Sequence, residues 1–166
     1  TTILTIRSYL YMILKKHSPF LVVIIQWAML SEAASQTHWE TAIYTEDTWR
    51  YFVGTSAPPA NWNELGFDES NWSSGPGGFG YGDDDDNTTI PNTLAVFFRK
   101  SFQVDELDEI ISAAIHGDYD DGFVAYINGV EISRSYNMGT PGTTVPYDQT
   151  TEGDHEAVMY QGGIPD

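Results

Sequence analysis

Phe123-Val-Ala-Tyr-Ile-Asn-Gly-Val-Glu-Ile-Ser-Arg134 carries the clearest structural signal in this chain. Apolar residues alternate with other residues on both sides of Asn128-Gly129, as they do in strands that bury one face. Asn and Gly are the residues that best tolerate the positive φ angles of a two-residue type I′ turn. The stretch therefore predicts a β-hairpin. It says little about activity.

The segments that precede the hairpin predict further strands. Trp49-Arg-Tyr-Phe-Val53 is a short aromatic strand, and Leu94 to Val104 is a longer one with alternating faces. Asp105 to His116 has the apolar spacing of a helix and also that of a strand. We favour a strand from about Ile110, because the run stops at a glycine and its neighbours are strands.

The composition agrees with an all-β domain. The 166 residues include 15 glycines, 8 prolines and 23 aromatic residues, which suits many turns and short strands. Pro58-Pro59 cannot lie inside a strand ladder and predicts a loop. Ser73 to Gly82 is rich in glycine and predicts a second loop.

The charge and the absence of cysteine exclude several functions. Lys and Arg number 7 against 24 Asp and Glu, a formal charge of −17. Unassisted binding to nucleic acid or to an anionic membrane needs a basic face, so we expect neither partner. A chain without cysteine has no disulfide framework, thiolate zinc site or cysteine nucleophile.

The first 36 residues differ from the rest. From Met12 a basic start is followed by the apolar run Phe20-Leu-Val-Val-Ile-Ile25 and then by small residues, the parts of a secretory signal peptide. A membrane anchor or a buried helix is the alternative. We divide the chain into an upstream segment (1–11), a signal peptide (12–36) and a β-sandwich domain (37–166). The predicted location is secreted or at the cell surface, with no membrane contact after cleavage.

Two aspartate clusters are candidates for a structural Ca²⁺ site. Asp83 and Asp85 have the alternate spacing of a calcium loop, and Asp118, Asp120 and Asp121 precede a glycine. Calcium prefers six to eight oxygen ligands on turning backbone, which such clusters supply. Neither cluster fits the full EF-hand pattern. The alternative is a solvated acidic loop for the first cluster and a hairpin-entry turn for the second.

Aromatic side chains near glycine-rich loops are candidates for sugar recognition. Flat rings stack on the apolar faces of sugars, while polar and charged side chains bind the hydroxyl groups. The candidate ligand-binding residues are Trp62, Trp72, Tyr81, Tyr119 and Arg134. The alternative is that the rings fill the core of a small sandwich, and it is stronger for the two tryptophans. No catalytic motif that we recognise occurs, so we do not expect an enzyme in this chain.

The order of motifs resembles a family of secreted bacterial modules. The motifs are Trp49-Arg-Tyr, Pro58-Pro-Ala-Asn-Trp62, Phe67-Asp-Glu-Ser-Asn-Trp72, Gly75-Pro-Gly-Gly-Phe-Gly-Tyr-Gly82, Phe98-Arg-Lys-Ser-Phe102, Asp118-Tyr-Asp-Asp-Gly122 and Tyr126-Ile-Asn-Gly-Val-Glu131. They are similar to galactose-binding-like jelly-roll domains of large exported Bacteroidetes proteins, which often also contain spore-coat-H-like kinase or lamin-tail domains. The hairpin also resembles the sugar-binding domain of family 2 glycoside hydrolases.

The resemblance implies a fold but no particular site. The expected fold is an antiparallel β-sandwich of jelly-roll, galactose-binding-like type, incomplete at the C-terminus because no closing strand precedes Asp166. The expected function is a non-catalytic carbohydrate-binding or adhesion module, with carbohydrate and the neighbouring domains of the same chain as partners. Two alternatives remain: a structural spacer that presents a neighbouring enzyme, and a fragment of a secreted hydrolase or kinase-like protein.

Overall fold

The computed structural model describes residues 2–4, 10–18, 36–82 and 86–157, and within them the fold is all-β. The strands pair antiparallel except for one short parallel pair. The only helical turn in these ranges is a 3₁₀ segment, Leu107–Glu109. The expected fold class is confirmed at this level.

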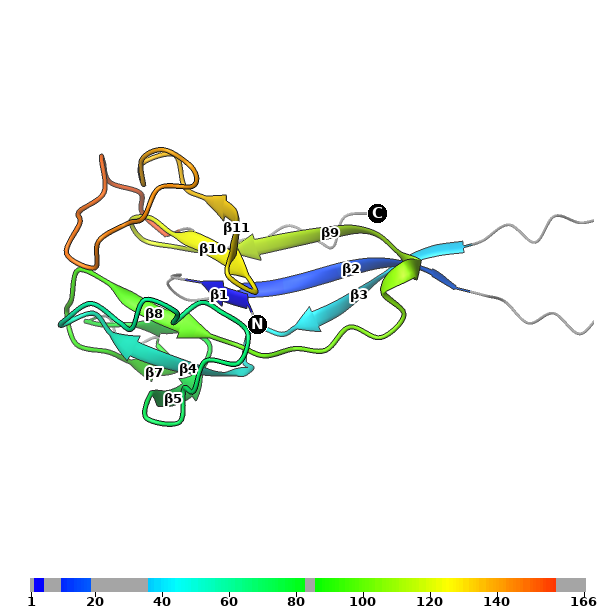
Figure 1. Ribbon diagram of the computed structural model, residues 1–166, viewed down its shortest axis with the longest axis horizontal. Coiled ribbons are helices and arrows are strands. Elements are labelled where there is room, and N and C mark those ends of the chain that lie inside the picture. Colours follow the sequence, from blue (N-terminus) through cyan, green and yellow to red (C-terminus); the bar gives the residue numbers. More distant parts are fainter. Residues whose placement is uncertain (1, 5–9, 19–35, 83–85, 158–166) are drawn as a thin grey trace, which may run out of the picture.

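Two small sheets face each other in the body of the molecule (Figure 1). The first has the order β5-β4-β8, with β5 at Ser73–Pro76, β4 at Thr48–Val53 and β8 at Val96–Arg99. The second has the order β1-β10-β11, with strands at Thr2–Leu4, Val124–Ile127 and Val130–Arg134. A parallel pair, β6 (Phe79–Gly80) and β7 (Thr88–Thr89), lies beside them.

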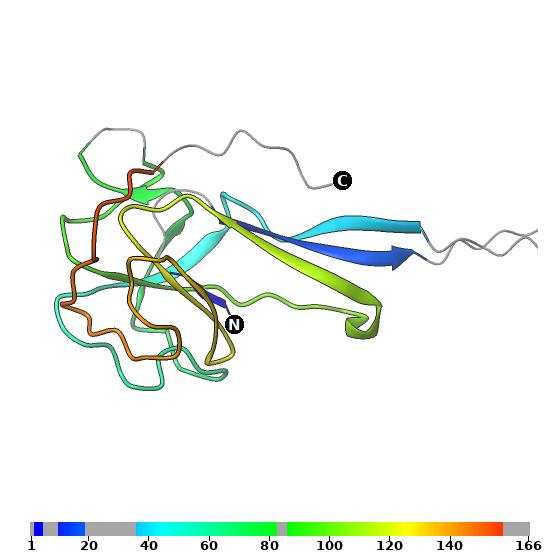
Figure 2. The same cartoon turned by 90° about the horizontal axis from the view of Figure 1, so that it is seen from above.

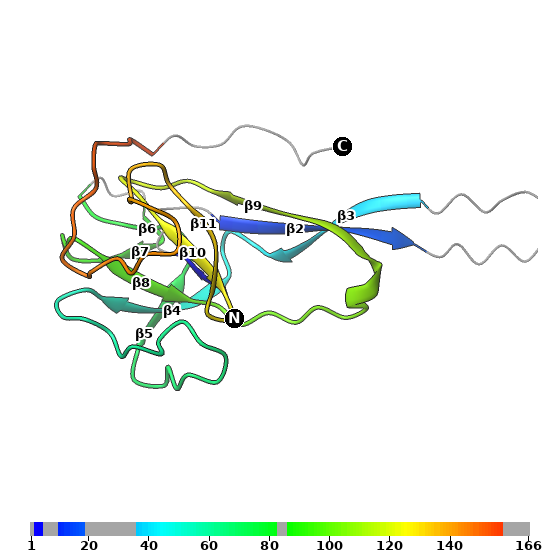
Figure 3. The ribbon, with the colours of Figure 1, turned by 45° about the horizontal axis from the view of Figure 1, so that its top comes forward.

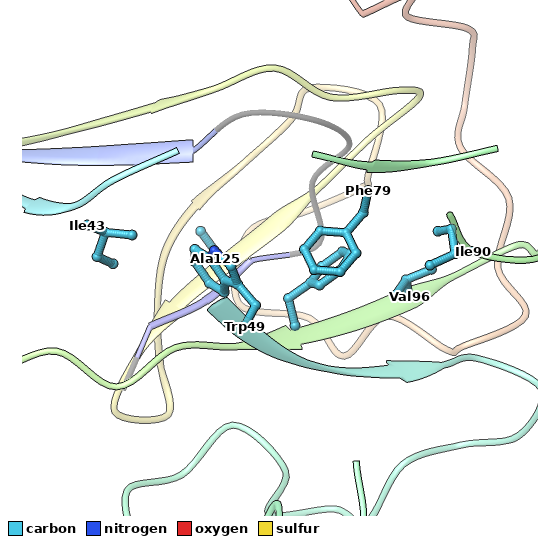
Figure 4. Close-up of a cluster of buried hydrophobic side chains, with 7 residues drawn as sticks. Ile43, Trp49, Phe79, Ile90, Val96 and Ala125 are labelled. Carbon is cyan, nitrogen blue, oxygen red and sulfur yellow. The ribbon is translucent and has the colours of Figure 1, made fainter. Parts of the chain in front are cut away.

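The hydrophobic core lies between these elements (Figure 4). Alternate residues of β8 point inward, so Val96 and Phe98 belong to the core while Phe97 and Arg99 occupy the outer face of the strand. Ala125 of β10 is fully buried against the same cluster. The other members of the core are Ile43, Trp49, Phe79 and Ile90.

A three-stranded arm extends from this body (Figures 2 and 3). Its order is β3-β2-β9, with β3 at Gln36–Ile43, β2 at Leu10–Ser18 and β9 at Ile110–Gly117. β1 and β2 therefore come from the range set aside as upstream segment and signal peptide. The apolar run Phe20–Ile25 lies outside the described residues, and the signal peptide stays a prediction.

The strand predictions near the hairpin are confirmed. Asn128 and Gly129 have φ angles of 50° and 84°, as a type I′ turn requires. A bulge in β11, between the residues paired with Ala125 and Tyr126, shifts the register. The ambiguous segment is a strand from Ile110, as predicted.

Two predictions about segment type need correction. The strand expected over 94–104 covers only Val96–Arg99, which pairs with Arg50 to Val53 of β4; it begins at Val96, opposite the last residue of β4. The glycine-rich segment 73–82 is not only a loop, since β5 and β6 lie in it. Glycine permits the close packing there: a Cβ at Gly75 would lie 2.5 Å from Thr88 Oγ1.

Candidate ligand-binding pocket

A pocket of about 330 Å³ lies beside β8, between this strand, β10 and the segment that follows the hairpin. Five stretches of the chain contribute lining residues: Trp62, positions 79–81, positions 90–98, positions 120–126 and positions 138–151. Seven of the lining residues are aromatic: Trp62, Phe79, Tyr81, Phe97, Phe98, Tyr126 and Tyr147. Concave aromatic pockets with a few polar groups are the usual form of small-molecule sites.

Trp62 connects the pocket to an aromatic cluster on the outer face of β8. Its ring meets Phe97 edge-on at a centroid distance of 4.7 Å and Tyr126 edge-on at 5.9 Å. On its other side it stacks on Trp72, with centroids 6.3 Å apart and the planes 24° from parallel. The Trp62 ring is half-buried, so one part of it packs while another part faces the pocket.

A buried arginine holds the loop that carries Trp62. Arg99 is 2% exposed, and its Nη1 donates to the carbonyls of Trp62 and Glu64. Its Nε donates to Glu69 Oε2 in an ion pair, and its Cζ lies 5.0 Å from the centre of the Phe67 ring. One guanidinium thus fixes three points of the loop against the outer face of the sheet.

The turn before β10 forms another wall of the pocket, through Asp120, Asp121 and Gly122. Asp121 Oδ1 accepts a hydrogen bond of 3.1 Å from the backbone N–H of His155. The buried Asn137 donates through Nδ2 to the carbonyl of Asp121 at 3.0 Å. These bonds hold the turn in place from two later segments of the chain.

Arg134 holds the loop that follows the hairpin. Its Nε and Nη2 each donate at 2.7 Å to the Glu131 carboxylate, and its other N–H groups reach Met138 O and Thr143. The hydrogen bonds to Arg134 lower the pKa of Glu131, and the bond from the Gly142 N–H lowers it further. The same Glu131 pairing raises the pKa of Arg134 above its ordinary value. The arginine therefore stays charged and internally bound.

The predicted binding residues are only partly brought together. Trp62 and Tyr81, and also Asp120 and Asp121, line the pocket. Trp72 is buried behind Trp62, where Phe52 and Phe67 pack on it at 5.5 Å. Tyr119 stacks on the His155 ring at 4.0 Å, and Arg134 binds Glu131 as described above. Trp72, Tyr119 and Arg134 therefore do not line the pocket, and they pack or bind within the segments around it.

The calcium prediction stays open. Asp83 and Asp85 lie outside the described residues. Within the part of the chain that the structure describes, no three His, Asp or Glu side chains converge so as to hold a metal ion. Asp118 is buried at 9% exposure and does not line the pocket.

Five of the seven lining rings were not among the predicted site residues: Phe79 and Phe98, which belong to the hydrophobic core, and Phe97, Tyr126 and Tyr147. Phe97 and Tyr126 are the outward members of their strands, and the strand pattern alone did not indicate that Trp62 would meet both. Tyr147 lies in a turn-rich region that carried no signal. Burial raises the pKa of Tyr126, and the negative charge of Glu131 adds to the effect while Arg134 opposes it. Its phenol therefore stays neutral and able to donate a hydrogen bond.

Comparison with known proteins adds no relative to this description. No family model, curated protein or solved structure matches the chain. Among the described residues, no helix has the length and apolar character needed to cross a bilayer. The pocket must therefore be interpreted from its own residues.

Proposed function

We propose that this chain is a carbohydrate-binding module of a secreted multidomain protein, and that its binding site is the aromatic pocket beside β8. Its fold is a β-sandwich of jelly-roll, galactose-binding-like type. The observation that carries the proposal is that Trp62 and Tyr81, singled out for sugar stacking, both line one pocket although they lie in different loops.

The other lining residues fit the same ligand class. Polar side chains from Asn92, Thr93, Gln149, Thr150 and Thr151 lie around the aromatic residues. Sugars present apolar C–H faces and polar hydroxyl rims, so a site for them needs rings and hydrogen-bonding groups together. The pocket supplies both. The acidic clusters add a proposed structural role for Ca²⁺, which rests on the sequence alone.

A glycan array probed with the wild-type chain tests this function. Trp62→Ala and Tyr81→Ala should each lower the binding of the recognised glycan at least about tenfold, the loss expected for a stacking ring. Tyr136→Ala is the matched control, because Tyr136 is 76% exposed and does not line the pocket. Trp62→Phe separates lost stacking from misfolding, since it keeps an aromatic ring.

The spacer alternative makes a different prediction. A structural spacer would bind no glycan, and deleting it would lower the activity of a neighbouring domain. Absence of binding to every glycan on the array by correctly folded protein would remove the proposed function.

A further inference from the structure

The aromatic rings that line the pocket do not share one plane. The Trp62 plane stands at 79° to the Phe97 ring and at 78° to the Tyr126 ring. The Phe79 and Phe98 planes are 48° apart, with their ring centres separated by 4.6 Å. All five rings belong to the lining. They therefore do not form a flat platform along which successive units of an extended glycan could stack.

The parallel ring contact of Trp62 does not extend the stacking surface either. Trp62 stacks on Trp72 with the two planes 24° apart, but Trp72 is buried and does not line the pocket. Phe52 and Phe67 also pack on Trp72. The stack thus continues into a packed cluster, where a second sugar unit would find no open ring face.

The walls of the pocket leave room for a short ligand. The segment 138–151 contributes lining residues, and Arg134 fixes it through hydrogen bonds to the carbonyls of Met138 and Thr143. The turn at Asp121 forms another wall, held by the bond from the His155 N–H. The volume of about 330 Å³ lies near the lower end of the range of roughly 300–1,000 Å³ that is usual for small-molecule sites. Such a space suits one or two sugar rings.

We propose that the pocket binds the end of a glycan, taking one or two terminal sugar units, and that it does not bind the interior of a long chain; this rests on the proposed function. Trp62 and Tyr81 supply rings for the terminal unit, and lining side chains such as Asn92 and Gln149 supply hydrogen-bonding groups for its hydroxyls. Walls that are fixed before binding reduce the entropy lost when the ligand is ordered. Units beyond the second extend into solvent and add no contact.

Oligosaccharides of increasing length test this inference. The probes are the mono-, di-, tetra- and hexasaccharides of the cello-, xylo-, manno-, galacto- and malto- series, titrated by calorimetry against the wild-type chain. In the series that binds, the affinity should reach its plateau by the disaccharide and then stay within about twofold up to the hexasaccharide. A site that runs along the chain would instead gain affinity with each added unit, since every unit brings new contacts.

Variants of a wall residue assign the length limit to the pocket. Tyr147→Ala shortens a lining side chain of the segment 138–151, so the hexasaccharide should then bind at least about threefold more tightly than the disaccharide. Tyr147→Phe keeps the ring and should keep the plateau, which separates the loss of the wall from misfolding. Tyr136→Ala is the matched control, because Tyr136 is exposed and does not line the pocket, and it should leave the plateau unchanged.

The outcomes separate this inference from the proposed function. A steady rise in affinity from the disaccharide to the hexasaccharide in the wild-type chain would overturn end binding and leave carbohydrate binding intact. A plateau that persists in Tyr147→Ala, or is lost equally in Tyr136→Ala, would also overturn the inference for this pocket. Absence of binding to every saccharide by correctly folded protein would overturn both proposals.

Discussion

Two walls of the pocket are each held by a buried arginine paired with a glutamate, but the two pairs are built differently. Arg99 pairs with Glu69, which lies 30 residues earlier in the chain, in the loop that carries Trp62. Arg134 pairs with Glu131, three residues earlier on the same strand, and holds the loop that begins at Met138. Both arginine side chains are 3% exposed or less.

The two ion pairs depend on different parts of the fold being in place. The Glu131–Arg134 pair needs only the hairpin, whose turn and register are local. The Arg99 pair needs β8, β4 and the whole loop 61–72 in place at once. Arg99 also donates hydrogen bonds to the backbone carbonyls of Trp62 and Glu64. Its loss should therefore damage the fold more than the loss of Arg134.

The largest expected effect is that of Arg99→Met. It removes a buried charge and leaves Glu69 and two carbonyls without their partner, so the free energy of unfolding should fall by about 3–5 kcal/mol. Urea denaturation followed by tryptophan fluorescence measures it. Glu69→Gln keeps an oxygen acceptor and should lose less. If Arg99→Met lowered the free energy of unfolding by less than about 1 kcal/mol, Arg99 would stabilise the fold by packing alone and its hydrogen bonds would add nothing.

A smaller loss is expected for Arg134→Met. Thr143 is exposed, so water can satisfy its carbonyl once the arginine is gone, and we expect a loss of about 2 kcal/mol. Hydrogen exchange should speed up at the Gly142 N–H, which donates to Glu131. The double variant with Glu131→Leu should recover part of the stability, because it also removes the unpaired carboxylate. A loss as large as that of Arg99→Met would contradict the distinction between the two pairs.

Gly129→Val tests the local element on which the Arg134 pair depends. A Cβ at Gly129 meets no atom closer than 3.6 Å, so the cost comes from the backbone, where a β-branched residue is forced to a φ of about 84°. We expect a loss of about 1 kcal/mol in the free energy of unfolding. Gly129→Asn, which tolerates that region, should lose less. An unchanged melting temperature for the valine variant would count against the turn.

The contrast between local and long-range contacts also explains which features could be predicted from the sequence. The hairpin was predictable because Asn128-Gly129 and the alternation beside it are local signals. Arg134 was predicted as a ligand-binding residue, but the alternation of the hairpin strands does not indicate that Glu131, Met138 and Thr143 accept its hydrogen bonds instead. The alternation of β8 predicted that Arg99 and Phe98 lie on opposite faces of the strand. Only the tertiary fold reveals that loop 61–72 covers that face.

The residues of the pocket could likewise be predicted from the sequence only in part. Trp62 and Tyr81 were predicted from residue type, since tryptophan and tyrosine near glycine-rich turns suit sugar stacking. Tyr126 and Tyr147 line the same pocket but lie 45 or more residues further along the chain, a separation that no periodicity encodes. The length of β8 was overestimated for a similar reason, because the strand begins only at Val96, opposite Val53, where its partner β4 ends.

The smallest effect that we expect is a dependence of stability on pH through Glu131. Its pKa is held below the ordinary value of 4.5, so its pairing with Arg134 stabilises the fold fully above that value. The contribution is lost as the pH falls through the lowered pKa, because protonation removes the charge.

The Glu131→Gln variant has no carboxylate at this position and cannot lose a charge by protonation. The stability difference between wild type and this variant should stay constant from about pH 7 to pH 5 and shrink below that, by less than about 1 kcal/mol. Asp68, whose pKa is also lowered, by hydrogen bonds from Ser70, titrates in both proteins and cancels in the difference. A difference that stays flat down to about pH 3 would mean that the carboxylate charge adds nothing to the pair.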